Sequence, residues 1–246
     1  AVAAAHRSDG LVDPTVLEDL LAAGYRESWD RTRRLDLRAA LDTATAPRRA
    51  ASPNAASRWR EIVVDDAAGT ITRPPGLRLD TGGTGKGHAA DLAGSLLGGY
   101  AHWAVDCGGD VRMGGETAGP RRVDIEDPFT GELSEGFTVR GGAVATSGLR
   151  SRIWAGADGT VRHHLLDPAT GAPCFSGLIA VTALAPTAVE AEALAKTALL
   201  TGPQGARRTL ARHGGAAFHE DGRVERIGAP APRATVRFRM PARRAA

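Results

Sequence analysis

The amino-acid sequence predicts an α+β fold in which mixed sheet layers pack against helices. Its length of 246 residues, of which 42% are hydrophobic, is enough to bury a substantial core in one globular unit. Strand-like and helix-like segments follow one another in irregular order, which favours layered packing over a regular strand-helix-strand winding. A glycine-rich stretch at residues 79–97, expected to change from a short strand to an amphipathic helix, lies at the centre of this arrangement.

The first 60 residues are predicted to contain one packed helix followed by an exposed linker. Apolar residues recur at helical spacing over residues 14–23, where Asp13 can cap the start and Gly24 can end the helix. Residues 1–30 are therefore predicted to be a partial N-terminal helical segment. Residues 31–60 are rich in Arg, Ala, Thr and Pro, and we expect them to be a linker or mobile loop.

The remainder is predicted to be a core at residues 61–229 followed by a mobile Arg/Pro-rich tail at residues 230–246. Strand-like segments that flank short turns predict hairpins at residues 59–73, 153–166 and 216–227. Further strands are expected at residues 103–106, 123–126, 136–140, 143–145 and 178–184. Helical spacing predicts helices at residues 187–200 and 203–213.

Composition excludes several classes of protein. The net charge is only +3 and there is no long basic run, so nucleic-acid binding is not indicated. No apolar run is long enough to span a membrane and no signal peptide is visible, which leaves the compartment open between cytoplasmic and exported. Cys107 and Cys174 fit no metal-binding spacing, and two cysteines alone do not distinguish a disulfide from two thiols.

The glycine-rich stretch is typical of a turn that cradles phosphate. Its glycines leave the backbone free to curl with exposed N–H groups, and the helix that follows directs its positive end at the same place. Lys86 lies in the middle of the turn. The glycines are Gly82, Gly83, Gly85 and Gly87.

Two familiar nucleotide-binding patterns do not match this stretch. A P-loop aligned on Lys86 needs glycine where the chain has Asp80, and Ser or Thr where it has Gly87. The dinucleotide-binding pattern fails on spacing. On the residues of this stretch alone, a plain glycine-rich connection between strand and helix remains an equal alternative.

Read together in order and spacing, five blocks resemble the ApbE family of FAD:protein FMN transferases. The resemblance covers residues 10–222, beginning with GLVDPTV at 10–16, which is similar to the family's FDPTV segment. The family normally has additional sequence before that segment, so we expect this chain, which starts without Met, to be cut or shortened. The five blocks are LDTGGTGKGHAAD, VDCGGDVRMGG, ATSGLRSR, HHLLDPATGAP and AEALAKTALLTG.

The resemblance implies an activity and its partners. The family splits FAD at its pyrophosphate and attaches the FMN half through a phosphoester to a Thr or Ser of a target protein, with release of AMP. FAD is then a substrate, and a flavin-acceptor protein is the partner. Two alternatives are an FAD-binding protein without transfer activity and an FAD pyrophosphatase that uses water as the nucleophile.

Phosphoryl transfer requires positioning of the reacting groups and cationic stabilisation of the transition state. For these roles we select Lys86, Asp80 as organiser of the glycine turn, and His164 to accept or steer the hydroxyl proton. Alternation along a strand sends His163 and His164 to opposite faces. The resemblance selects His164, because this residue precedes LLDP as the family's histidine precedes its IIDP.

The resemblance also implies a set of ligand contacts, although residues 108–110 on their own read equally as a tight turn between strands. The turn glycines and Lys86 are placed to hold the pyrophosphate. Asp110 follows two glycines after a strand, and the Thr146 and Ser147 hydroxyls can bond phosphate or flavin oxygens. The complete set expected to bind FAD is Gly82, Gly83, Lys86, Asp110, Thr146, Ser147 and His164.

The resemblance also implies Mg²⁺, held by the Gly85 carbonyl and by an acid and a threonine four residues apart on the late helix. Here Glu192 is the acid, but Lys196 replaces the threonine, and lysine cannot donate an oxygen to Mg²⁺. Either a weakened site remains on Gly85 and Glu192, or the Lys196 ammonium takes over part of the role of the metal. An exposed Glu192–Lys196 pair without function is a third alternative.

Overall fold

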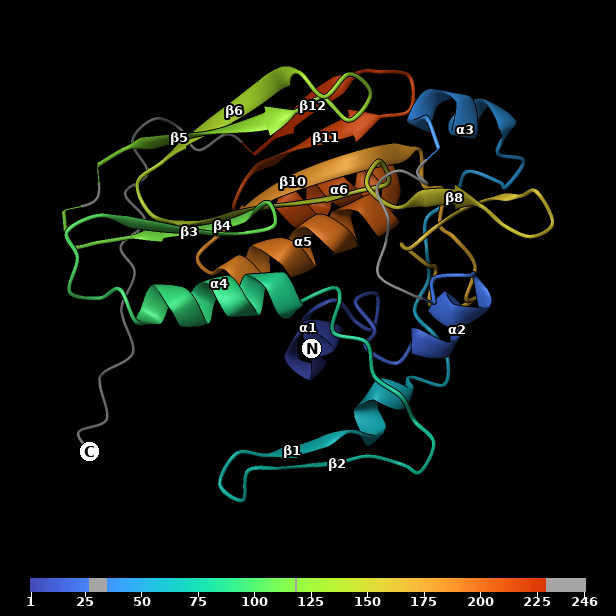
Figure 1. Cartoon of the computed structure of the whole chain (residues 1–246), viewed down its shortest axis with the longest axis horizontal. Helices are drawn as coiled ribbons and strands as arrows, with labels where there is room; N and C mark the ends of the chain where they lie inside the picture. Colours follow the sequence, from blue (N-terminus) through green and yellow to red (C-terminus); the bar gives the residue numbers. More distant parts are fainter. Residues whose placement is uncertain (27–34, 118, 229–246) are drawn as a thin grey trace.

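A computed structural model of the chain describes residues 1–26, 35–117 and 119–228. Its centre is an antiparallel sheet with strand order β12-β11-β10-β7-β4-β3 (Figure 1), which confirms the predicted α+β class. The sheet strands are β3 (Trp103–Cys107), β4 (Asp110–Gly114), β7 (Gly142–Gly148), β10 (Leu178–Ala185), β11 (Gly215–His219) and β12 (Val224–Ile227).

Helices α4 (Gly85–Ser95) and α5 (Ala188–Leu200) pack together on one face of this sheet, and α6 (Gly202–Leu210) follows α5 (Figure 1). The carboxylate of Asp91 joins the two helices, because it accepts hydrogen bonds from the first backbone amides of α5 at 2.9 and 3.0 Å. These amides have no partner within their own helix. Asp91 therefore fixes where α5 begins relative to α4.

Small side chains separate these helices from the sheet. We call the buried alanines at this place the alanine layer: Ala90, Ala143, Ala145, Ala185, Ala188 and Ala191. Their size lets the backbones approach closely, and a Cβ added to Gly87 would lie only 2.5 Å from the Ala188 carbonyl oxygen. The first turn of α4 is thus held directly against the start of α5.

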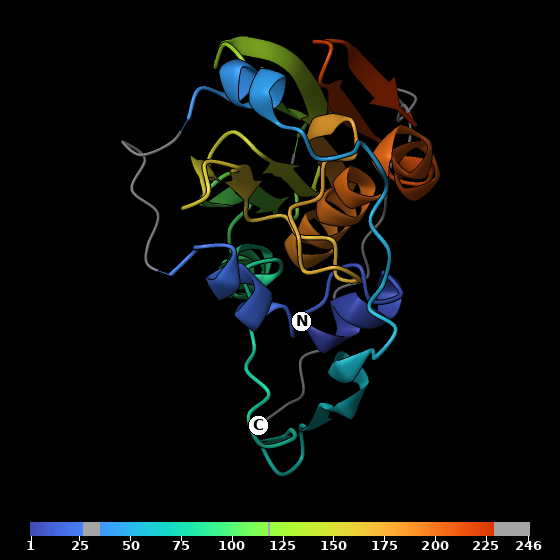
Figure 2. The same ribbon diagram turned by 90° about the vertical axis from the view of Figure 1, so that its right-hand side faces the viewer.

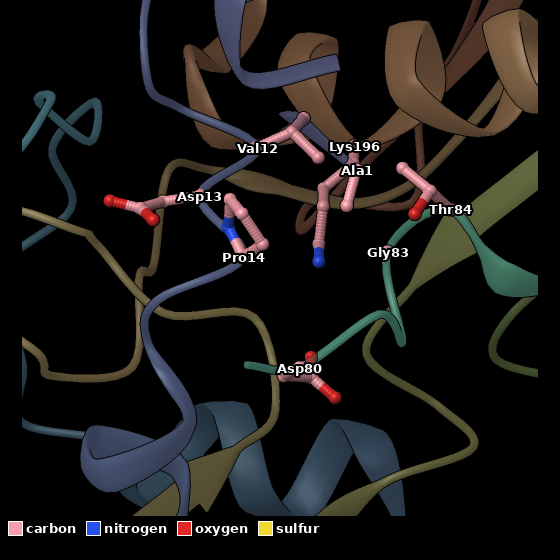
Figure 3. Close-up of a pocket in the computed structure, with 8 residues that line it drawn as sticks. All are labelled: Ala1, Val12, Asp13, Pro14, Asp80, Gly83, Thr84 and Lys196. Carbon is pink, nitrogen blue, oxygen red and sulfur yellow. The ribbon is translucent and has the colours of Figure 1, made fainter. Parts of the chain in front are cut away.

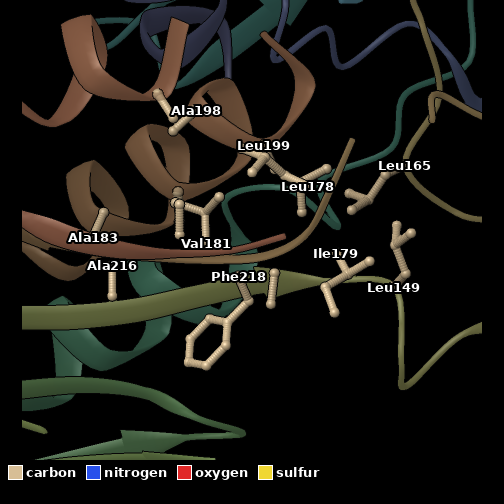
Figure 4. Close-up of a cluster of buried hydrophobic side chains, with 14 of the residues drawn as sticks. Leu149, Leu165, Leu178, Ile179, Val181, Ala183, Ala198, Leu199, Ala216 and Phe218 are labelled. Carbon is tan, nitrogen blue, oxygen red and sulfur yellow. The ribbon is translucent and has the colours of Figure 1, made fainter. Parts of the chain in front are cut away.

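Large side chains form a second cluster, which we call the main core and which reaches both faces of the sheet. The hairpin of β5 (Arg121–Glu126) and β6 (Leu133–Val139) covers the face opposite α4 and α5 and contributes Ile125 and Phe137 to this core (Figure 1). The main core extends along β10 to the second half of α5, as Figure 4 shows in part. Its fully buried members include Leu149, Ile153, Leu178, Ile179, Val181 and Leu199.

Smaller units flank the sheet. Helix α1 (Val2–Arg7) packs on the 3₁₀ helix η2 (Arg58–Glu61) and reaches Ala193 of α5 through Ala4. The predicted first hairpin is present as β1 (Val63–Asp65) and β2 (Thr70–Thr72), which project away from the sheet in both views (Figures 1 and 2). Helix α2 (Leu17–Ala22) lies beside the hairpin of β8 (Ile153–Ala155) and β9 (Val161–His163).

Residues 35–60 differ from the exposed linker that composition predicts. Helix α3 (Leu37–Thr43) buries Leu37 and Leu41 in the main core. Farther along, the amides of Arg49 and Ala51 donate to carbonyls of the body at 2.9 and 2.8 Å. The prediction is wrong here because alanines and two leucines form an apolar face that a count of Arg and Pro does not reveal. Residues 27–34 and the predicted tail at 230–246 lie outside the described residues.

The other predicted strands, hairpins and helices are present within a few residues, with three differences. Helix α2 begins at Leu17 rather than at residue 14, because Asp13 closes a turn with the amide and hydroxyl of Thr15, both at 2.7 Å. The short strand expected before the glycine turn is absent from residues 77–80. Strand β4, which was not predicted, starts at Asp110.

Candidate functional site

Three segments that are far apart in the sequence meet at one pocket beside α4 and α5 (Figure 3). They are the N-terminal segment, the glycine turn and the middle of α5. The residues that line the pocket are Ala1, Val12, Asp13, Pro14, Asp80, Gly83, Thr84 and Lys196. Asp80 and Gly83, both selected from the sequence, therefore share a pocket with Lys196.

The glycine turn leads directly into α4. Thr84 is the residue before the helix, and the amides of Thr84 and Gly85 close the turn on the Thr81 carbonyl at 3.0 and 2.8 Å. The amide of Gly87 donates to Glu192 Oε2 at 2.9 Å. Part of the donor set of the turn is therefore used within the protein, while the positive end of α4 still points at the pocket region.

Lys86 turns toward the sheet. Its ammonium lies 3.0 Å from Asp110 Oδ2 and donates to the Gly108 carbonyl at 3.4 Å. Asp110 is only 1% exposed and follows Gly108 and Gly109, whose φ values of +65° and +93° form the tight turn between β3 and β4. Burial raises the pKa of the Asp110 carboxyl, and the Lys86 ammonium opposes this shift.

Helix α5 contributes the buried acid Glu192 to the region of the Lys86–Asp110 pair. Its carboxylate is 5% exposed and holds the Gly87 amide, so it links α5 to the glycine turn. Burial raises the pKa of Glu192, and Asp110 acts in the same direction, whereas the Gly87 hydrogen bond and the ammonium groups of Lys86 and Lys196 oppose the shift. Two buried carboxylates and two lysines thus form one electrostatically coupled group.

Lys196 and Asp80 face each other across the pocket. The Lys196 ammonium lies against the Gly83 backbone, at a place where a Cβ on that residue would collide with it. Asp80 holds its carboxylate over Gly82, where a Cβ would lie 3.1 and 3.2 Å from the two oxygens. Burial lowers the pKa of Lys196, while the carboxylates of Asp80 and Glu192 oppose that shift.

The two adjacent histidines have different surroundings. His163 is fully buried against Phe175, with ring centroids 4.7 Å apart, and its Nδ1 accepts the Leu165 amide at 3.2 Å. Burial lowers its pKa to about 3. For His164, burial and then the charges of Arg152 and Lys196 hold the pKa well below its usual range. Arg152, which was not selected from the sequence, therefore acts on His164 together with Lys196, and the catalytic role of His164 stays a prediction.

Thr146 and Ser147 lie on opposite faces of β7. The Thr146 hydroxyl is 2.8 Å from that of Thr182, its partner on β10. Alternation places Ser147 on the same face as Ala145, which belongs to the alanine layer beneath α5. Only Ser147 of this predicted pair is thus on the side of the sheet that carries the pocket.

The residues present do not fit the Mg²⁺ site that the resemblance implies. Lys196 brings an ammonium to the place of an oxygen ligand, and the Oε2 atom of Glu192 is engaged with the Gly87 amide. Across residues 1–26, 35–117 and 119–228, no three His, Cys, Asp or Glu side chains are grouped as a metal site. The metal-ligand roles expected of Gly85 and Glu192 stay predictions.

Two further structural findings concern the described part of the chain. Cys107 and Cys174 are both free thiols, the first partly and the second fully buried. None of the helices in this part combines the length and the apolar character that crossing a membrane requires. The helix-joining residue Asp91 was not selected from the sequence, although it ends the glycine-rich block.

Comparison with known proteins gives a consistent result. The family model described as the ApbE family matches residues 1–219. The FAD:protein FMN transferase of Escherichia coli K12 is 34% identical over 151 residues, which cover 58% of this chain and 42% of that protein. The one from Rhodobacter capsulatus is 29% identical over 85% of this chain and 38% of its own length. The chain thus spans about two fifths of the length of these relatives.

Solved structures agree with the sequence comparisons. The crystal structure of the ApbE protein from Thermotoga maritima superimposes with a TM-score of 0.70 at 28% identity, covering 92% of this chain and 73% of that one. A flavin transferase ApbE from Vibrio cholerae, at 21% identity and a TM-score of 0.63, shares the fold. The antiparallel sheet with α4 and α5 on one face is therefore an architecture common to these proteins.

Proposed function

The chain belongs to the ApbE family, and from this premise we propose that it is an FAD:protein FMN transferase. It cleaves the pyrophosphate of FAD, attaches FMN to a Thr or Ser of a flavin-acceptor protein and releases AMP. Relatives that cover most or about half of this chain carry that name. FAD is the substrate that this activity requires, and the acceptor protein is the partner.

The observation that carries the proposal is the joining of the glycine turn to α5. The bond from the Gly87 amide to Glu192 spans 105 residues of sequence and brings the positive end of α4 to the side chains of α5. A helix N-terminus and nearby cations suit a diphosphate, whose charge grows on its oxygens as the bond to the leaving group breaks. The missing side chains of Gly82 and Gly83 leave room for the Asp80 carboxylate and the Lys196 ammonium to lie against the turn.

The transfer step assigns roles to the remaining residues. The acceptor hydroxyl attacks the phosphorus of the FMN half, forming one P–O bond while the bond to the bridging oxygen breaks and AMP leaves with that oxygen. His164 takes the hydroxyl proton. Burial and then the charges of Arg152 and Lys196 hold its pKa low, so the ring is neutral and able to accept a proton. The negative charge of a bound diphosphate offsets the effect of the two cations and so raises this pKa.

Other polar groups hold the reactants. The Asp80 carboxylate orders the turn over Gly82, the Ser147 hydroxyl offers a hydrogen bond from β7, and the Lys86–Asp110 pair fixes the turn between β3 and β4. Mg²⁺ is implied by the resemblance. Because the site does not fit it, we assign no step to a metal ion.

The experiment combines the purified chain with FAD and a flavin-acceptor domain, with and without Mg²⁺. Flavin fluorescence that stays on the acceptor after denaturation, together with AMP, is the expected result. His164→Ala should slow transfer by about 100-fold or more, whereas His102→Ala, which removes an exposed histidine before β3, should not. FAD binding without either product would show a binder instead, and FMN with AMP in the absence of acceptor would show a pyrophosphatase.

A further inference from the structure

Lys196 is an unusual residue for its position on α5. Ala188 and Ala191 of α5 belong to the alanine layer and Glu192 bonds the Gly87 amide, whereas Lys196 extends a long cation into the pocket beside the glycine turn. Lysine occurs only at positions 86 and 196 of the sequence, and every other basic side chain of fixed charge is arginine. A compact ammonium, rather than a planar guanidinium, is therefore present at both positions beside the turn.

The two lysines are used differently. Lys86 is ion-paired with the buried carboxylate of Asp110 at 3.0 Å. The negative charges of Asp80 and Glu192 raise the pKa of the Lys196 ammonium through space. Within residues 1–26, 35–117 and 119–228, however, no hydrogen bond or ion pair joins this ammonium to a side chain. The Lys196 ammonium thus keeps its donors for a ligand.

The contact with Gly83 places this ammonium over the turn. Because the side chain lies against the Gly83 backbone, its charge is next to the stretch that leads into the N-terminus of α4. A diphosphate held by that turn would meet the ammonium directly. Arg152, which acts on both Lys196 and His164 through space, adds a second positive charge on this side.

We propose that the Lys196 ammonium binds the diphosphate of FAD over the glycine turn in place of a divalent cation, so that this chain needs no Mg²⁺. The inference rests on the proposed function for the identity of the ligand. An ammonium supplies one charge and three donors, and the end of α4 and Arg152 supply further positive potential. Charge-assisted hydrogen bonds to phosphate oxygens are roughly twice as strong as those between neutral groups.

The first test is FAD affinity, because it does not depend on turnover. Wild-type protein should bind FAD equally well in EDTA and in millimolar Mg²⁺. Lys196→Met keeps the length of the side chain but removes the charge, and it should weaken binding about tenfold or more in EDTA. Lys196→Thr should show the same loss in EDTA but recover when Mg²⁺ is added, since it restores an oxygen ligand.

A matched control removes a cation elsewhere. Arg208 is exposed on α6, and Arg208→Ala should leave FAD affinity unchanged. Thermal melting of each variant shows whether the fold is retained, and Lys196→Arg, which keeps the charge with a larger head group, should retain part of the affinity. Unchanged FAD binding by Lys196→Met in EDTA would overturn the inference, and so would wild-type binding that requires Mg²⁺.

FMN transfer by the wild type separates this inference from the proposed function. Transfer in EDTA supports both. Transfer that appears only with Mg²⁺ refutes the inference and leaves the proposed function in place. Charge-dependent FAD binding in EDTA without transfer under any condition supports the role of Lys196 and refutes the transferase.

Discussion

The alanine layer and the main core differ in the size and charge of what they pack. The main core is built from large apolar side chains such as Phe137 and Ile179. The alanine layer is built from methyl groups, and the charged residues Asp91, Asp110 and Glu192 lie at its edge on the same side of the sheet. Arg112 of β4 also points to the face of the sheet that carries α4, since its Nε lies 3.0 Å from the Asp91 carboxylate of that helix.

Because the two regions differ in side-chain size, one mainly stabilises the fold and the other mainly positions the site. Large side chains remove the most apolar surface from water, so the main core supplies most of the stabilisation. Small side chains bring the helix backbones close to each other and to the sheet, so the alanine layer fixes the positions of the glycine turn and of Glu192. Changes in the two regions should therefore have different consequences, and each prediction below uses one region as the control for the other.

The largest loss of stability should come from Phe137→Ala in the main core. Phe137 is 2% exposed, and its removal leaves a cavity that should lower the free energy of unfolding by about 3–5 kcal/mol. The FAD affinity of the folded variant should stay within about twofold of wild type, because this face is opposite the pocket. Urea unfolding and FAD titration measure the two effects. Leu133 on the same hairpin is 70% exposed, so Leu133→Ala should cost less than about 0.5 kcal/mol.

For Gly87→Ala we expect a smaller loss of stability than for Phe137→Ala but a larger loss of FAD affinity. Its Cβ would lie 2.5 Å from the Ala188 carbonyl oxygen, so α4 and α5 must separate and strain the bond to Glu192. We expect about 1–3 kcal/mol of destabilisation and a loss of FAD binding that exceeds what unfolding explains. The control is Gly99→Ala, where the added Cβ meets nothing within 4 Å. Normal FAD affinity in Gly87→Ala would refute the idea that close helix packing positions the site.

The pH dependence of stability tests whether His163 belongs to the buried core, unlike its neighbour His164. His163 in the folded protein has a pKa of about 3, whereas in the unfolded chain it takes its ordinary value of about 6.5. Between pH 7 and 5.5 only the unfolded state therefore gains this proton, so acidification destabilises the native state. His163→Leu removes that contribution, and wild type should lose about 1.2 kcal/mol more than the variant over this range. Urea unfolding at both pH values measures it, and parallel losses would contradict the assignment of His163 to the core.

The sequence predicts those features that depend on residues close together in the chain, and it misses those that depend on residues far apart. Hairpins and long helices carry local signals, and they are found where spacing and turn residues place them. Helix α3 was missed because its apolar face is recognised only when the main core is known. At the site, the glycine turn and Glu192 follow from motifs. The role of Asp91 arises from hydrogen bonds to a segment 97 residues away, and that of Arg152 from its charge near His164 and Lys196, which no local pattern reveals.

The smallest effects should distinguish Thr146 from Ser147, neighbours that the sequence treats alike. Thr146→Val leaves the buried Thr182 hydroxyl without its 2.8 Å partner and should cost about 1 kcal/mol of stability without changing FAD affinity. Ser147→Ala should keep the stability and weaken FAD binding about threefold to tenfold, as expected for the loss of one hydrogen bond. Urea unfolding and FAD titration of both variants decide the matter. If Thr146→Val is the variant that binds FAD poorly, the ligand contacts the face of the sheet opposite the alanine layer, and the division between a stabilising face and a binding face is wrong.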